Sequence, residues 1–286
     1  MTATLIPHEL IEKTIKFLIL GVIQGISEFL PISSTAHLKV IPMMIGWGDP
    51  GISISAAIQL GSILAVIIYF KQDIKSVLKG IYLGWHQDYW RRKDSQLGLS
   101  IIAGTIPIVL AGLLIKLFWK DFENTIFRSI PGIACLSICM AVLLALSEKF
   151  GVRNKKLDQI NITDGVLIGI GQMFALIPGV SRSGISISFS LMNGFKREDA
   201  ARFSFLLGIP AISIAGLVGL QDVLKADLLA EGLPLLAGIF SAAIVSWLSI
   251  DWLLKYLQTH GTWIFVIYRI LFGISLLVWH VISVKY

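Results

Sequence analysis

Six apolar runs, each about 20 residues long, constrain this chain more than any other feature of its sequence. A run of that length is what an α-helix needs to cross the hydrocarbon core of a bilayer. Charged residues make up only 15% of the chain and the mean hydropathy is +0.79, which excludes an ordinary water-facing surface. We therefore predict an all-α integral membrane protein with about six transmembrane helices, forming a single membrane domain over residues 1–286. The runs cover 52–70, 97–118, 129–147, 201–220, 233–254 and 263–282.

Two further apolar stretches, 17–45 and 163–193, are interrupted by proline and glycine and carry polar side chains. Pro31 interrupts the first stretch, and Pro178 with Gly179 interrupts the second. Backbone groups freed by such residues find no partner in lipid, so this backbone must face protein or a wet cavity. We predict that each stretch forms a re-entrant helix–loop–helix hairpin and that the chemistry lies at the two interruptions.

The two interrupted stretches also resemble each other. Residues 21–34 contain Gly-x-x-Gln, a proline and two serines, and residues 169–183 contain the same order with a shift of about one residue. Three long apolar runs follow each stretch. This order predicts an inverted-topology repeat, with a site at the interface between its halves. The repeats would be 1–147 and 148–286; coincidence in a glycine-rich sequence is the alternative.

The net charge of +6 would suggest a nucleic-acid partner in a soluble protein. Here the basic residues lie mainly in short loops between apolar runs, where they report orientation in the membrane. The loops 71–96, 148–162, 193–202 and 254–262 hold more Lys and Arg than the loops on the other side. We therefore assign these loops to the cytoplasm and both termini to the outer face, and we expect no nucleic-acid partner.

Polar and ionisable side chains gather at the first interruption. An ionisable group inside a bilayer costs about 2.5–3.5 kcal/mol, so each one is a functional hypothesis. Glu28 is such a group, with Gln24 one turn earlier on the same helix face. His37 follows Ser34 by one turn and is expected to lie beside it. In the alternative, the serines only cap the next helix, Glu28 reaches the interface and His37 is a satisfied polar group.

The second interruption reads PGVSRSG over residues 178–184. Its glycines let backbone amides turn inward as an anion nest. Arg182 adds a guanidinium whose fork matches a phosphate. In the alternative, Arg182 forms a structural ion pair with a carboxylate such as Glu28. The residues that we expect to bind phosphate, from both interruptions, are Ser33, Thr35, Gly179, Ser181, Ser183 and Gly184.

Together the two interruptions supply what phosphoryl transfer needs, which is mainly positioning and charge stabilisation. A polar group that reaches a membrane-embedded pocket arrives on a lipid tail, so we predict a lipid phosphate ester or anhydride as the substrate. A lipid-phosphate transporter or flippase is the alternative function, because inverted repeats with broken helices are also a transporter plan. Arg269, in the last apolar run, either supports the site or reaches toward an interface.

Both interruptions resemble the undecaprenyl-diphosphate phosphatase family of the bacitracin-resistance type. The similarity lies in GVIQGISEFLPISSTAH over 21–37 and PGVSRSG over 178–184, and extends to QLGSILAV over 59–66 and FSFLLGIP over 203–210. The resemblance implies removal of the terminal phosphate of undecaprenyl diphosphate, which returns the monophosphate lipid carrier to cell-wall synthesis. It also implies a multi-pass protein of the bacterial inner (plasma) membrane with a site open to the outer face.

The resemblance assigns catalytic roles to Glu28, Ser34, His37 and Arg182. The family's Glu/Gln-x3-Glu motif falls on Gln24 and Glu28, which implies a bound divalent cation, Mg²⁺ or Ca²⁺. Many members have Glu where this chain has Gln24, so the cation here would have one carboxylate ligand rather than two. The state of assembly stays open, with a homodimer among the options.

We hypothesise that Ser34, oriented by His37, attacks the terminal phosphorus. Arg182 and the backbone amides of 179–184 would hold the diphosphate, and water would then hydrolyse a phosphoserine. The alternative mechanism has His37 or Glu28 activate water directly, with Ser34 acting only as a hydrogen-bond donor.

Overall fold

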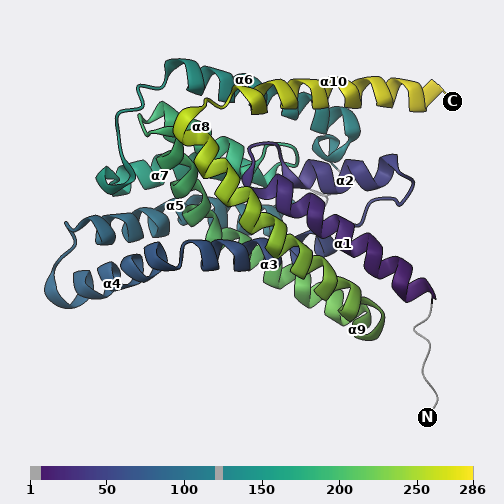
Figure 1. Ribbon diagram of the computed structural model, residues 1–286, viewed down its shortest axis with the longest axis horizontal. Coiled ribbons are helices and arrows are strands. Elements are labelled where there is room, and N and C mark those ends of the chain that lie inside the picture. The colour runs from purple at the N-terminus through teal and green to yellow at the C-terminus, as the bar shows by residue number, and fades with distance from the viewer. Residues whose placement is uncertain (1–7, 120–124, 286) are drawn as a thin grey trace, which may run out of the picture.

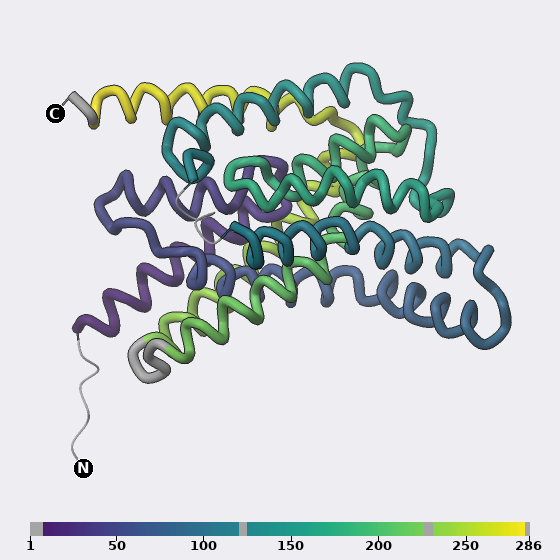
Figure 2. The backbone as a smooth tube through the Cα atoms, turned by 180° about the vertical axis from the view of Figure 1, so that it is seen from behind, coloured from purple at the N-terminus to yellow at the C-terminus, as the bar shows by residue number. Residues whose placement is uncertain are grey.

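The computed structural model describes residues 8–119 and 125–285, and every regular element in these ranges is helical. The two chain ends, which the sequence analysis assigns to the outer face, include residues 1–7 and 286, which lie outside the described residues. Figures 1 and 2 show α6 (Ile130–Phe150) and α10 (Trp263–Lys285) lying side by side along one edge of the molecule. Three single-turn helices, η2 (Ile126–Arg128), η3 (Leu157–Gln159) and η4 (Phe174–Leu176), connect longer ones.

Within the described residues, six helical segments are long and apolar enough to cross a membrane. They coincide with the six predicted runs, so that prediction is confirmed; an unbroken apolar run of this length is itself the signal. Four segments belong to α3 (Ile52–Tyr69), α5 (Lys93–Phe118), α6 and α10, and the other two are the Arg197–Lys225 and Glu231–Thr259 parts of α9 (Arg197–Thr259).

The two spans of α9 run back along each other beside α3 (Figures 1 and 2). A Cβ on Gly216 would meet Leu60, and a Cβ on Gly61 would meet the carbonyl oxygen of Ile239. Residues 216 and 239 therefore reach the same level of α3, which requires the chain to reverse between them. The sequence leaves residues 221–232 between two predicted apolar runs; the first span ends at Lys225 and the second begins at Glu231, so the spans meet in that interval.

Each interrupted stretch folds as two helices separated by a break, in the helix–loop–helix order predicted for it. The first break separates α1 (His8–Phe29) from α2 (Ser34–Met44). The second follows α7 (Ile162–Met173) and η4, and it ends at α8 (Arg182–Met192). Since α2 and α8 have 11 residues each, they are about 16 Å long, roughly half the hydrocarbon thickness.

A helix occupies most of the region that the sequence analysis treats as the loop 71–96. This helix, α4 (Lys71–Gln87), packs on the start of α5, and the pair projects from one end of the molecule (Figures 1 and 2). Ser95 Oγ donates to the carbonyl oxygen of Gly80 at 2.7 Å, and a Cβ at Gly80 would lie 2.6 Å from the backbone of Asp94. The sequence indicated a loop here because charged residues surround the few small residues with which α4 packs on α5.

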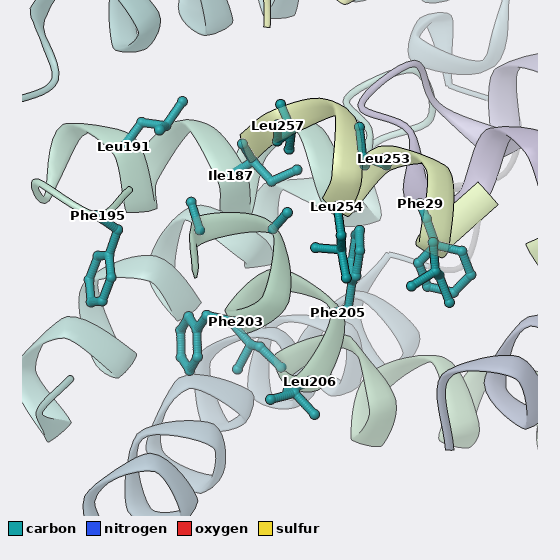
Figure 3. Packing of buried hydrophobic residues seen from close by; sticks show 14 of the residues in the cluster. Phe29, Ile187, Leu191, Phe195, Phe203, Phe205, Leu206, Leu253, Leu254 and Leu257 are labelled. Carbon is teal, nitrogen blue, oxygen red and sulfur yellow. The ribbon is translucent and has the colours of Figure 1, made fainter. Parts of the chain in front are cut away.

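The largest hydrophobic core joins α1, α8 and both spans of α9 (Figure 3). The rings of Phe29 and Phe205 meet edge to face with centroids 5.0 Å apart. Ile187 from α8 and Leu253 from the second α9 span belong to the same buried cluster. This packing holds the helices on either side of the breaks in fixed positions, because packed interiors deform little.

Glycines let helices from the two halves approach closely. A Cβ at Gly21 on α1 would lie 2.2 Å from the carbonyl oxygen of Gly238 on α9. A Cβ at Gly169 on α7 would lie 2.2 Å from the carbonyl oxygen of Gly104 on α5. Small residues at such crossings are how membrane helices pack without a hydrophobic driving force. The arms of both interrupted stretches are fixed in this way.

Candidate active site

The two breaks meet at one carboxylate, that of Glu28. This residue lies near the end of α1 and is 5% exposed. Its Oε2 accepts hydrogen bonds from Ser34 Oγ at 2.6 Å and from Gln24 Nε2 at 2.8 Å. Its Oε1 faces Arg182 Nη2 at 3.3 Å. Residues far apart in the sequence therefore share one buried hydrogen-bonded group.

Both breaks turn through a serine in the left-handed region of backbone conformation. Ser33 has φ 81° and precedes α2, and Ser181 has φ 70° and precedes α8. A non-glycine residue with positive φ is uncommon and marks strain held by the surrounding structure. The sharp turn aims the first residue of each helix, Ser34 or Arg182, at Glu28.

Two helix N-termini therefore converge on Glu28. The first N–H groups of a helix have no intrahelical acceptor, and the helix dipole makes this end positive. At α2 these groups belong to Ser34, Thr35 and Ala36. An anion such as a phosphate is stabilised at such an end. The arrangement suits a ligand that carries more than one negative charge.

Arg182 lies in a space that only glycine leaves open on α9. A Cβ at Gly208 would lie 2.0 Å from Arg182 Nη1, so the guanidinium rests directly on this glycine. Nη1 donates to the carbonyl oxygen of Ser204 at 2.9 Å. Among the residues that the structure describes, buried Nε has no hydrogen-bond partner. The ion pair with Glu28 that the sequence analysis weighed is present, yet it leaves this donor unused.

His37 does not orient Ser34, which corrects the predicted pairing. Its Nδ1–H donates to the carbonyl oxygen of Ser33 at 2.7 Å. Its Nε2 lies 2.6 Å from the hydroxyl of Tyr268, and its ring stacks on Phe272 with centroids 4.3 Å apart. The physical reason is that both ring nitrogens are already bonded, one to this carbonyl and one to Tyr268 from α10, so neither is available to Ser34.

The predicted phosphate ligands are partly engaged with the protein itself. The N–H of Gly184 donates to Ser181 Oγ at 3.1 Å, and Ser183 Oγ donates to the carbonyl oxygen of Leu30 at 3.0 Å. These bonds shape the second break and tie it to the first, so Gly184 contributes no free amide to an anion nest. Gly179 has φ 93°, a backbone conformation that favours glycine, and its role as a phosphate ligand stays a prediction. Ser33 and Thr35 pair through their hydroxyls at 3.2 Å.

The oxygen atoms around Glu28 fit a hard divalent cation. Buried Gln24 Oε1 has no hydrogen-bond partner among the described residues, while Gln24 Nε2 bonds both Glu28 and Ser62. Mg²⁺ and Ca²⁺ take carboxylate and amide oxygens as ligands. Within residues 8–119 and 125–285, no three His, Cys, Asp or Glu side chains form a metal cluster. A cation here would therefore combine one carboxylate with neutral oxygens and substrate oxygens.

Comparison with known proteins identifies the family. The family model for bacitracin resistance protein BacA matches residues 17–275. The chain belongs to this family. It is 59% identical over 271 residues to an undecaprenyl-diphosphatase of Prochlorococcus marinus (strain MIT 9313), covering 95% of this chain and 91% of that one. It is 58% identical over 270 residues to an undecaprenyl-diphosphatase of Synechococcus sp. (strain WH7803), covering 94% of each chain.

Sequence reasoning missed several residues that complete this BacA-family site. Gly208 and Ser204 receive the guanidinium of Arg182, and Tyr268 bonds His37. Ser62 bonds Gln24 and also accepts from Ser246 at 2.8 Å. Single serines and glycines inside apolar runs carry no local signal of such contacts. Gly208 could have been found only as part of the 203–210 similarity.

Proposed function

We propose that this chain is an undecaprenyl-diphosphatase, a membrane hydrolase that converts undecaprenyl diphosphate to the monophosphate and inorganic phosphate. The relatives that match nearly its whole length carry that name. The observation that carries the proposal is the bonded group of Ser34, Glu28 and Arg182, which combines a nucleophile, a base and a cation in one buried place. A nucleophile activated by an adjacent base, with a cation that stabilises charge on the transferred group, suits phosphoryl transfer.

Ser34 is the nucleophile in this proposal and Glu28 is its base. The Ser34 hydroxyl already donates to Glu28 Oε2 at 2.6 Å, which is the geometry of a general-base pair. As Ser34 Oγ bonds to the terminal phosphorus, its proton passes to Glu28 and the bond to the bridging oxygen breaks. The lipid leaves as its monophosphate. Water then hydrolyses the phosphoserine to release inorganic phosphate.

Arg182 holds the diphosphate in this scheme. Its Nε has no hydrogen-bond partner among the described residues and its Nη2 bonds only Glu28, and a guanidinium binds phosphate oxygens with two parallel hydrogen bonds. When the diphosphate binds, its oxygens replace Glu28 as the acceptor of the Arg182 Nη2 hydrogen bond. The Glu28 carboxylate is then free to accept the proton of Ser34. The N-termini of α2 and α8 add to the positive potential. His37 keeps Ser33 in its turn through its bond to that carbonyl.

A divalent cation completes the site in the proposal, held by Glu28 and by Gln24 Oε1. When bound, it neutralises part of the diphosphate charge. Its presence is tested by chelation: EDTA should lower phosphate release, and Mg²⁺ or Ca²⁺ should restore it. Gln24→Glu adds the second carboxylate and should lower the cation concentration for half-activation. Unchanged activity in EDTA, with no cation dependence in either protein, contradicts the cation site.

We also propose that the two halves are an inverted repeat whose breaks are re-entrant from the membrane surface, with the site open to the outer side of the bacterial plasma membrane. Three correspondences fall at one constant offset along the chain: Gly21 with Gly169, Gln24 with Gln172, and Ser33 with Ser181. The paired serines share positive φ, and each precedes a helix of 11 residues. Cysteine accessibility at the breaks in intact cells tests which side is open.

A lipid-phosphate transporter remains the second candidate, because the same repeat and mid-chain breaks are used by transporters. Purified protein in detergent, given undecaprenyl diphosphate, separates the two. Release of inorganic phosphate without a membrane supports the hydrolase. Movement of labelled lipid across vesicles, with no phosphate release in detergent, would replace the proposal with the transporter.

A further inference from the structure

Among the described residues, Arg269 is the largest fully buried side chain that the proposed chemistry does not use. It lies on α10 and is 1% exposed, which excludes the interfacial role that the sequence analysis left open for it. None of its bonds within the described residues goes to a carboxylate; all three go to backbone carbonyl oxygens. A buried charge is costly unless its donors are satisfied, so these bonds must justify its position.

The carbonyl partners of Arg269 come from both breaks. Nη1 donates to the carbonyl oxygen of Pro31 at 3.1 Å, and Nη2 donates to that of Gly179 at 2.8 Å. Pro31 and Gly179 each stand two residues before the positive-φ serine of their break. They therefore occupy the same position in the two turns, and one guanidinium fork bridges them.

The third bond anchors Arg269 where α6 and α10 cross. Its Nε donates to the carbonyl oxygen of Ser137 at 3.2 Å, and Ser137 Oγ donates to the carbonyl oxygen of Arg269 at 3.1 Å. Figures 1 and 2 show these two helices side by side. The Nε side of the guanidinium is thus bonded to the α6–α10 pair, and its two terminal nitrogens, Nη1 and Nη2, bond the two breaks.

We propose that Arg269 is a positioning residue that sets the separation and orientation of the two breaks, and so fixes Arg182 relative to Ser34 and Glu28. The proposal rests on the hydrolase function proposed above. Arg269 acts on this reaction through the carbonyls of Pro31 and Gly179, rather than by bonding the three reacting side chains. A planar fork is required, because a single ammonium does not satisfy two separate carbonyls in fixed directions.

The kinetic test compares Arg269→Gln and Arg269→Lys with wild-type enzyme in detergent. A misplacement near 1 Å costs about 10²-fold in rate, so we expect Arg269→Gln to lower kcat by about that factor with KM within about threefold. Arg269→Lys keeps the charge and should rescue poorly. Ser137→Ala is the matched control: it removes one bond at the same crossing but keeps the fork, and kcat should stay within about twofold.

A double-mutant cycle separates positioning from direct substrate contact. If Arg269 works by placing Arg182, then Arg269→Gln should cost little further in an Arg182→Ala background. A full additive loss would mean that Arg269 contacts the phosphate itself and would overturn the proposal. So would wild-type kcat in Arg269→Gln, or full rescue by Arg269→Lys. If Arg269→Gln does not fold, Arg269→Lys carries the test, with the unfolding midpoint measured beside kcat.

Failure of the proposed function gives a different result. In that case wild-type protein releases no phosphate, whatever residue stands at 269. An active wild type with an equally active Arg269→Gln rejects only the positioning role.

Discussion

The first and second breaks have similar backbone conformations and different side chains. Each has a positive-φ serine, a hydroxyl pair and an 11-residue helix behind it. At the first helical position, however, one break has Ser34 and the other has Arg182. In the proposed mechanism the two breaks therefore have different roles, with the nucleophile at the first break and the cation at the second.

The difference at the first helical position gives the largest expected effect. Ser34→Ala should lower kcat for phosphate release by about 10⁴-fold or more, because the nucleophile is lost. Ser188→Ala is a matched control, since this buried α8 hydroxyl bonds only the carbonyl oxygen of Gly184 among its described contacts. It should stay within about threefold of wild type. Equal activity of both variants would leave water as the nucleophile and remove this contrast.

Filling the space at Gly208, where the Arg182 guanidinium lies, should give an intermediate loss of activity. Gly208→Ala places a methyl group where the guanidinium lies, so Arg182 must move. We expect kcat/KM for phosphate release to fall by about 10²-fold, as for other misplacements near 1 Å. In an Arg182→Ala background the same change should cost little, because nothing remains to be displaced.

Gly112→Ala on α5 provides the control for this substitution. A Cβ there would meet only the end of Leu176, at 3.9 Å. Activity should be unchanged, and helix propensity should rise slightly. A Gly208→Ala enzyme with the activity of Gly112→Ala would show that Arg182 does not need its present position.

The two strained serines give the smallest effect and the sharpest comparison of stability. Ser33→Gly should raise the free energy of unfolding by about 1 kcal/mol, because glycine accepts positive φ without strain. Ser181→Gly should gain less, since Ser181 Oγ also caps α8 by accepting the N–H of Gly184. Ser33 has no such cap bond. Unfolding midpoints in one detergent measure the order, and equal shifts would contradict the difference.

The sequence predicts the parts of this fold that depend on long patterns. Six apolar runs predict six spans because length and hydropathy alone define them. Glu28 and Arg182 stand out because charge is rare in such runs, and the structure brings them together. The helix α4 was missed because its buried face is made of small residues among charges.

Contacts across helices could not be read from the sequence. The bond from Ser34 to Glu28 depends on the turn at Ser33. His37 does not contact Ser34 as expected, because its Nε2 bonds Tyr268 from α10. The role proposed for Arg269 depends on its hydrogen bonds to the carbonyl oxygens of Pro31 and Gly179, which are distant from it in the sequence. Such contacts are fixed by packing between distant helices, which has no local sequence signature.

In the proposed mechanism both breaks act on one diphosphate, and the second break acts through Arg182, so removal of Arg182 shows whether both breaks are needed. The measurement is steady-state release of inorganic phosphate from undecaprenyl diphosphate by purified wild-type and Arg182→Ala protein in detergent. We predict a loss in kcat on the order of 10³-fold for Arg182→Ala, and Arg182→Lys should restore little of it. Near-normal release by Arg182→Ala would contradict it, because the first break alone would then suffice.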